Sequence, residues 1–174
     1  MTGVQTCALP IFVVAGCLLR TVDPFEFVAA FVAIFLGWTL LEYGIHRFLF
    51  HFDKRFAWGQ RLAFIVHGCH HVDPADPTRN IMPVPASLPV FLAFFALFAL
   101  LVPLPSALIG FGCIGFGYMT YDLTHYACHQ LPMKNRLGRW LKRHHLQHHF
   151  RNPDRNFAVT LPLWDLVFRT DAAR

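Results

Sequence analysis

Apolar residues in this chain gather into long runs, and polar stretches separate them. The longest run, residues 81–121, holds 41 consecutive residues without an Asp, Glu, Lys or Arg. A helix that crosses a bilayer needs about 20 apolar residues, so this run is long enough for two. Pro103 and Pro105 divide the run, because proline cannot continue a helix interior. The pattern therefore predicts a hairpin of two membrane-spanning helices, roughly residues 85–102 and 106–121.

Two shorter apolar segments precede this hairpin. Residues 25–41 are apolar apart from Glu26, and a helix that continues towards His46 would reach spanning length. Residues 12–19 are too short to span a bilayer, and we expect them to be the remaining part of a first membrane helix that ends at Arg20. The chain is thus expected to have about four spans, of which the first is truncated.

The first eleven residues are a separate case. Residues 1–11 read MTGVQTCALPI, which matches the in-frame translation of a common sequencing-adapter oligonucleotide. A segment of such origin carries no information about the fold of the protein. We therefore expect residues 1–11 to be an artefact and residues 12–174 to form a single membrane domain.

Composition supports a membrane protein. Hydrophobic residues make up 55% of the sequence and charged residues 14%, whereas a soluble domain carries about 25% charged residues. This deficit argues against a disordered chain and against an ordinary soluble enzyme. The net charge of +5 does not predict a nucleic-acid partner, because basic loops are usual in membrane proteins.

The basic residues also predict an orientation. Of 15 Lys and Arg residues, 14 lie in the stretches 43–80 and 130–174, which the predicted spans place on one side of the membrane. The positive-inside rule assigns that side to the cytoplasm, and all eleven histidines lie on it as well. The sequence therefore predicts an all-α protein, a multi-pass transmembrane stem with a cytoplasmic, His-rich helical cap.

Ten of the eleven histidines fall into four short clusters. Residues three or four apart share a helix face, so three clusters each present their imidazoles in one direction. The remaining pair is five residues apart and would diverge by about 140° on an ideal helix, so we expect a bend or a helix end at its second member. The clusters are H-x4-H (His46, His51), H-x2-H-H (His67, His70, His71), H-x3-H (His125, His129) and H-x2-H-H (His145, His148, His149).

Clustered imidazoles point to metal binding. Neutral imidazole is the commonest metal ligand in proteins, and one zinc ion takes about four ligands. A lone histidine is usually structural, but ten in repeated motifs on one side of the membrane are enough to hold two metal ions. His144 lies outside the spacing, and we leave it out of the predicted site.

The histidine clusters belong to longer sequence motifs. These motifs are Glu42-Tyr43 with His46 and His51, His67-Gly-x-His70-His71 with Pro74 and Asp76, Tyr118-x-x-Tyr121-Asp122-x-x-His125, Leu141-Lys142-x-x-His145-x-x-His148-His149, and Phe157-Ala-Val-Thr with Leu163-Trp164-Asp165. They resemble the fatty acid hydroxylase superfamily, and within it most closely the fatty acid 2-hydroxylases, which α-hydroxylate sphingolipid acyl chains. The similarity covers roughly residues 25–170. Cys128, Ala158 and His144 depart from the family pattern, but none of them replaces one of the ten expected ligands.

This resemblance implies a non-haem dimetal oxygenase that hydroxylates the acyl chain of a fatty acid or sphingolipid, with C2 as the expected position and O2 as co-substrate. Cleaving an unactivated C–H bond requires a redox-active metal, so iron is expected, although zinc can occupy such a site in purified protein. We expect the protein to lack the cytochrome b5 domain that is fused to some relatives. Electrons are therefore expected from a separate donor, either cytochrome b5-like or ferredoxin-like. The membrane would be the plasma membrane of a bacterium or the endoplasmic reticulum of a eukaryote.

Four further residues are candidates for roles around the metals. Asp122 and Glu42 each lie about one helical turn before a predicted ligand and could support it, although solvation at a helix end would also explain Asp122. Tyr121 could act beside the site and Tyr118 could border the substrate path. Aromatic residues are also common at membrane interfaces without a catalytic role.

Other functions remain open from the sequence. The same scaffold could carry out desaturation, or oxidise a sterol or carotenoid. A non-catalytic metal-binding or metal-transport membrane protein is a different class. Transport predicts ionisable residues within the spans, and the run of residues 81–121 has none.

Overall fold

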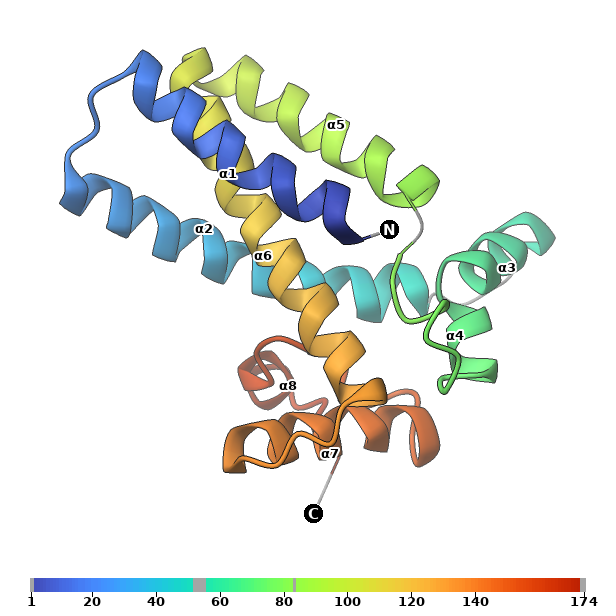
Figure 1. Cartoon of the computed structure of the whole chain (residues 1–174). Coiled ribbons are helices and arrows are strands. Elements are labelled where there is room, and N and C mark those ends of the chain that lie inside the picture. The colour runs from blue at the N-terminus through green and yellow to red at the C-terminus, as the bar shows by residue number, and fades with distance from the viewer. Residues whose placement is uncertain (1, 52–55, 83, 173–174) are drawn as a thin grey trace. The chain divides into compact units, whose positions relative to one another are not determined.

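In the computed structural model, which describes residues 2–51, 56–82 and 84–172, every regular element is helical (Figure 1). The all-α prediction is therefore confirmed for these residues. The longer helices are α1 (Thr2–Leu19), α2 (Pro24–Gly44), α5 (Val84–Leu101), α6 (Leu104–Gln130) and α7 (Arg136–Phe150). The shorter ones are α3 (Ala57–Ala63), α4 (Cys69–Val72), α8 (Leu163–Val167) and two π-helical segments, η1 (Ile45–Phe50) and η2 (Phe64–Gly68).

The chain divides into two compact units. The first consists of Met1–Trp38 and Pro83–Thr120, and the second of Thr39–Met82 and Tyr121–Arg174. The helices α2 and α6 each contribute to both units. The apolar runs of the sequence belong to the first unit, and all eleven histidines belong to the second.

Close helix packing holds the first unit together. A Cβ at Gly16 of α1 would lie 2.6 Å from the Pro105 carbonyl oxygen of α6, and a Cβ at Gly117 of α6 would lie 2.5 Å from Trp38 Cγ of α2. Only glycine leaves room for such approaches, which are typical of helices that pack in a membrane. The Phe12 ring meets the Phe111 ring edge-on, with centroids 4.9 Å apart.

The predicted break in the long apolar run is confirmed. The α5 helix ends at Leu101 and α6 begins at Leu104, so Pro105 lies in a first helical turn, where its missing N–H costs nothing. However, α6 continues past the expected end at residue 121 as far as Gln130. The prediction placed the end where charge returns, at Asp122, but a charged residue does not end a helix.

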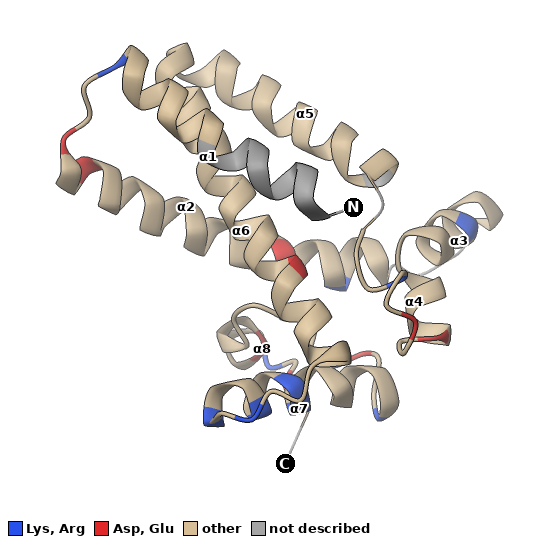
Figure 2. Ribbon diagram, in the orientation of Figure 1, with Lys and Arg blue, Asp and Glu red and all other residues tan. Residues whose placement is uncertain are grey.

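Apolar character is also unevenly distributed among the helices. Within the described residues, one helix, Pro24–Phe50, is long and apolar enough to cross a membrane, with 27 residues and a mean hydropathy of 1.9. The apolar part of α5, Ser87–Leu101, is shorter. Figure 2 shows no charged residue on α5, whereas basic residues are grouped on α7. The described residues therefore contain one clear candidate span, and the four spans expected from the sequence are not confirmed.

The second unit is built around a small buried cluster of Tyr43, Phe157 and Ala158, with Trp164 packed against it. Its main amphipathic helix, α7, is preceded by the N-cap residue Asn135, whose side-chain oxygen accepts a hydrogen bond of 2.6 Å from Gly138 N. This is a usual N-cap arrangement. The cap fixes the start of the helix that carries three of the predicted metal ligands.

Candidate metal centre

The ten histidines predicted as ligands lie in two groups of five, both in the second unit. Within each group, one candidate ligand nitrogen per histidine lies within 4.8 Å of all the others. The first group comprises His46, His51, His67, His71 and His148, and the second comprises His70, His125, His129, His145 and His149.

The two H-x2-H-H motifs contribute to the groups in opposite ways. In the first motif the i,i+4 pair His67 and His71 belongs to the first group, and His70 belongs to the second. In the α7 motif the i,i+4 pair belongs to the second group, and His148 belongs to the first. Adjacent residues on a helix point about 100° apart, so each His-His pair serves both groups. The two groups are therefore linked through the same helices.

The H-x4-H pair is accommodated by a change of helix type. After α2 the chain forms the π-helix η1, which carries His46, and His51 follows as its C-cap residue. His51 N donates to His46 O over 3.2 Å, an i to i+5 bond. The wider π turn brings residues five apart closer to one face, and π segments recur at functional sites. The expected helix end at His51 is thus confirmed, and its π geometry was not predicted.

The nitrogens within each group lie at the spacing of metal ligands. Two nitrogens that are each about 2.1 Å from one ion, at about 90° to one another, are about 3.0 Å apart. The Nε2–Nε2 distances in the first group are 3.0 Å (His46–His67), 2.8 Å (His67–His71) and 3.2 Å (His71–His148). Those in the second are 3.0 Å (His70–His149), 3.1 Å (His145–His149) and 2.8 Å (His129–His145).

Backbone carbonyls determine which nitrogen of a ring carries the proton. In the first group, His46 Nδ1 donates to Phe157 O and His148 Nδ1 donates to Arg155 O over 2.7 Å. A carbonyl oxygen only accepts, so the proton of a neutral ring is on Nδ1 and Nε2 keeps its lone pair. Both lone pairs are therefore available to a metal ion in the first group.

The second group shows the same arrangement with one further detail. His125 Nδ1 donates to Asn80 O over 2.9 Å, which leaves a lone pair on Nε2. That Nε2 is buried and has no hydrogen-bond partner among the described residues. An unsatisfied buried polar atom costs about 1–3 kcal/mol, and a cation bound by the group would remove that cost. These residues therefore fit a metal ion.

Burial also favours the protonation state that coordination requires. Removal from water, reinforced by neighbouring imidazoles, lowers the pKa of His67 and His145 well below the usual value for histidine. The same causes lower the pKa of His129 to about 3. Neutral imidazole is the form that binds a metal, so these ligands need no deprotonation at neutral pH.

A loop after α7 supplies the carbonyls to the first group, and two buried carboxylates hold it. Glu42 Oε1 accepts from Val159 N and Thr160 N, at 2.8 and 2.9 Å. Glu42 was predicted to support a ligand, and among the described residues its hydrogen bonds are with this loop and not with a histidine. Asp165 Oδ1 accepts from Phe157 N over 2.9 Å, and its Oδ2 accepts from Ala158 N over 2.8 Å.

Asp165 was not among the predicted site residues. It is fully buried and also lies 2.9 Å from His144 Nε2, so His144 contacts this carboxylate and belongs to neither group of five. The only sequence signal for Asp165 was its place in the closing Leu163-Trp164-Asp165 motif. No spacing rule connects it to a histidine, because it acts through backbone N–H groups of the loop.

Asn80 is a second residue that the sequence did not reveal. It is buried, its carbonyl oxygen accepts from His125, and its side-chain amide lies 3.0 Å from His70 Nδ1. The amide also reaches Gln130 Nε2 at 2.8 Å. Asn80 thus contacts two members of the second group at once. One of these contacts uses the backbone, which any residue could supply, so no motif marks it.

The remaining candidates lie on α6. The Tyr121 ring is nearly parallel to the His125 ring, with centroids 5.7 Å apart, and Asp122 is buried one turn before His125. Tyr118 belongs to the first unit, where its ring packs edge-on against Trp38 and Phe91. The roles proposed for these three residues stay predictions.

A helical chain with two interlinked groups of five histidines defines a class, that of candidate binuclear metalloproteins. The family model of the fatty acid hydroxylases matches residues 31–170, and the chain belongs to this family. The resemblance seen in the sequence is therefore confirmed.

Two individual members of the family show how similar this chain is to known hydroxylases. The chain is 42% identical over 135 residues to the dihydroceramide fatty acyl 2-hydroxylase FAH2 of Arabidopsis thaliana, covering 78% of this chain and 57% of that one. It is 42% identical over 150 residues to the fatty acid 2-hydroxylase of Rattus norvegicus, covering 83% of this chain and 40% of that one. The chain thus spans about half the length of these relatives.

A solved structure matches the fold. It is described as full-length scs7p with only the hydroxylase domain visible. It superposes with a TM-score of 0.88 at 36% identity, covering 98% of this chain and 66% of that one. The ceramide very long chain fatty acid hydroxylase SCS7 of Saccharomyces cerevisiae is 41% identical over 144 residues, covering 80% of this chain and 36% of that one.

Proposed function

We propose that this chain is the catalytic part of a membrane-bound lipid 2-hydroxylase. The observation that carries the proposal is the pair of five-histidine groups, in each of which the candidate ligand nitrogens lie within 4.8 Å of one another and backbone carbonyls leave Nε2 lone pairs available to a metal ion. The names of the relatives, which are fatty acyl and ceramide hydroxylases, indicate the substrate class. The substrate is then the acyl chain of a fatty acid or sphingolipid, and the position is C2.

Each group of five would hold one metal ion, and iron is the metal that the reaction calls for. Bound iron supplies the redox chemistry that splits O2, which zinc cannot do. In the overall reaction one oxygen atom enters the C–H bond and the other leaves as water, which consumes two electrons and two protons. An external donor provides these electrons.

The chain's own residues position the ligands. The carbonyls of Phe157 and Arg155 hold two histidines of the first group, and that of Asn80 holds one of the second. Asp165 and Glu42 fix the loop that carries the first of these carbonyls. Such outer contacts orient ligands and increase their basicity. Burial of the histidines also keeps bulk water away from the groups.

The topology we propose has four membrane spans and a cytoplasmic cap. The candidate span Pro24–Phe50, the uncharged α5 and the basic residues of the second unit support it. An acyl chain is soluble in the bilayer, so a site at the membrane surface can receive it without desorption. The membrane is the plasma membrane in a bacterium or the endoplasmic reticulum in a eukaryote.

We also propose that residues 1–11 are foreign to the protein. Their adapter-like sequence supports this, and sequencing the locus from genomic DNA tests it. Recovery of these codons from the source genome would contradict the proposal.

Product analysis tests the function. The chain is expressed with candidate ceramides and fatty acids, and the lipids are examined by mass spectrometry. We expect a gain of one oxygen at C2, and loss of this product in the His70→Ala and His148→Ala variants, one from each group. A loss of two hydrogens would show desaturation, and oxygenation confined to sterols or carotenoids would show another oxidase. Metal binding without any lipid product would show a non-catalytic protein.

A further inference from the structure

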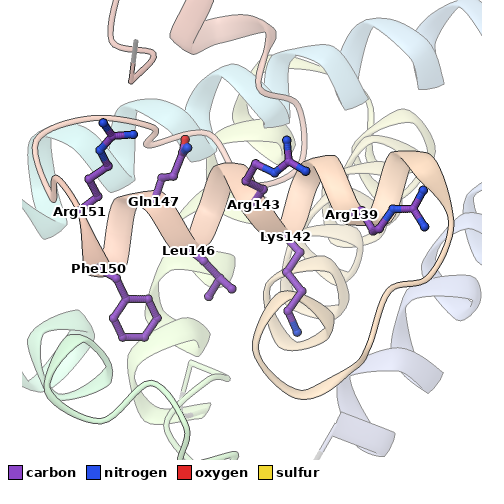
Figure 3. A pocket seen from close by; sticks show the side chains of 7 residues that line it. All are labelled: Arg139, Lys142, Arg143, Leu146, Gln147, Phe150 and Arg151. Carbon is purple, nitrogen blue, oxygen red and sulfur yellow. The ribbon is translucent and has the colours of Figure 1, made fainter. Parts of the chain in front are cut away.

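Helix α7 has a second face that the metal groups do not use. His145, His148 and His149 lie on one side of the helix. The opposite side lines a shallow pocket of about 500 Å³ (Figure 3). The labelled side chains form two rows along the helix in that figure, with Lys142, Leu146 and Phe150 in one row and Arg143 and Arg151 in the other. Arg139 lies at the end of the pocket.

The charge of this pocket is uncompensated. Four of its lining residues are cations and none is a carboxylate. Arg139 Nη1 donates to Lys134 O over 2.6 Å and Lys142 Nζ donates to Leu131 O over 2.7 Å. These carbonyls orient the cations without neutralising them. Arg143 and Arg151 form no ion pair with a described residue. An acidic partner is therefore the complementary one.

One residue that lines the pocket also contacts a predicted ligand. The Phe150 side chain lies at its edge, and the residue is 72% exposed. The centroid of the Phe150 ring is 6.1 Å from that of His149, a member of the second group. In a complex with a partner that covers Phe150, the Phe150 ring alone would therefore separate the partner from His149. Electron transfer slows steeply with distance, so this is a favourable place for a donor.

We propose that the basic face of α7 (Arg139, Lys142, Arg143, Arg151 and Phe150) is the docking surface for an acidic electron-carrier protein. This inference rests on the proposed hydroxylase function, which needs two electrons per turnover from another protein. Arginine and aromatic residues are enriched at protein interfaces. An anionic membrane surface would also match the charge of this face. It supplies no electrons, however, and it gives no role to the contact between Phe150 and His149.

Steady-state kinetics test the docking surface. The full chain is placed in nanodiscs of phosphatidylcholine, and reduced soluble cytochrome b5, an acidic haem protein, serves as the probe. In the Arg143→Glu/Arg151→Glu variant we expect KM for cytochrome b5 to rise at least tenfold and its dependence on salt to weaken. Turnover driven by dithionite and methyl viologen is expected to stay unchanged, because a small reductant needs no docking surface.

The control is Arg61→Glu, which reverses an exposed charge on α3 outside this face, and we expect its KM to stay near the wild-type value. Metal content and circular dichroism check that all variants are folded. An unchanged KM in the double variant would overturn the proposal, and so would a defect that appears only in nanodiscs with phosphatidylserine. If the wild type shows no turnover with cytochrome b5 and none with dithionite and methyl viologen, the proposed hydroxylase function is wrong. The docking proposal, which rests on that function, is then overturned as well.

Discussion

Asp165 shows how a single side chain can act on a metal centre that it does not touch. Its two oxygens accept hydrogen bonds from Phe157 N and Ala158 N, and the carbonyl of Phe157 accepts from His46. A carboxylate on backbone N–H groups makes strong, charge-assisted hydrogen bonds. Asp165 is therefore expected to position a ligand of the first group by fixing a loop.

Replacing Asp165 with asparagine should weaken metal binding in the first group only. The amide presents one acceptor oxygen where the carboxylate presents two, so the loop carbonyl loses its fixed position. Loss of such an outer contact typically lowers metal affinity by about 10–100-fold. Competition with a chelator, followed by metal analysis, should show that one ion is bound more weakly than in the wild type and that the affinity for the other ion is unchanged. The matched control is Asp154→Asn, an exposed carboxylate of the same loop region, and equal weakening in both variants would contradict the assignment.

Asn80→Ala should have the converse effect. The side chain contacts His70 and is linked to Gln130, so its removal loosens the second group and leaves the first unchanged. We expect about a tenfold loss of affinity for one ion. Cobalt substitution can follow each site by its visible absorption. A change in the spectrum of the ion in the first group would show that Asn80 does not act on the second group alone.

Among single residues, the sequence predicted the ten histidines but not their division into two groups. Spacing shows that His67 and His71 share a helix face. Whether His70 joins them depends on where α6 and α7 lie, which is set by tertiary packing. Asp165 acts through backbone N–H groups of the loop. Asn80 contacts His125 through its own carbonyl and His70 through its side chain, ten residues away. Neither role follows from the spacing of the motifs, so neither residue was predicted.

Among the elements, helix type matters as much as helix position. The segment η1 places His46 and His51 in one group although they are five residues apart. The sequence indicated that an ideal α-helix would not suffice, yet it did not distinguish a bend from a π turn. The break between α5 and α6 was predictable, because Pro103 and Pro105 act locally.

Packing between helices of the first unit can be tested at two glycines. In Gly117→Ala the new Cβ would lie 2.5 Å from Trp38 Cγ, and the rigid indole ring cannot yield cheaply. We expect a loss of about 1–3 kcal/mol in the free energy of unfolding, measured as a lower thermal midpoint in detergent. Gly37→Ala on α2 is the control, since nothing lies within 4 Å of its added Cβ. It should be neutral or slightly stabilising, and equal midpoints for the two variants would contradict this packing.

Across the whole molecule, apolar helices and charged, histidine-bearing segments separate into two units. This separation was visible in the sequence as the uncharged run 81–121 and the basic stretches around it. If both groups hold metal, removal of the ions by a chelator should lower the thermal midpoint of the protein, because a ligand that binds only the folded state stabilises it. Recovery on adding Fe²⁺, and none on adding Mg²⁺, would match nitrogen-rich sites. An unchanged midpoint would mean that the groups contribute nothing to stability through metal.

The most direct test of the account is the metal content of the purified protein, measured by inductively coupled plasma mass spectrometry against protein concentration by amino-acid analysis. Two groups of five histidines predict two transition-metal ions per chain, and iron after expression in iron-replete medium. One ion per chain, or none, in protein that is folded and freshly purified would contradict the dimetal centre.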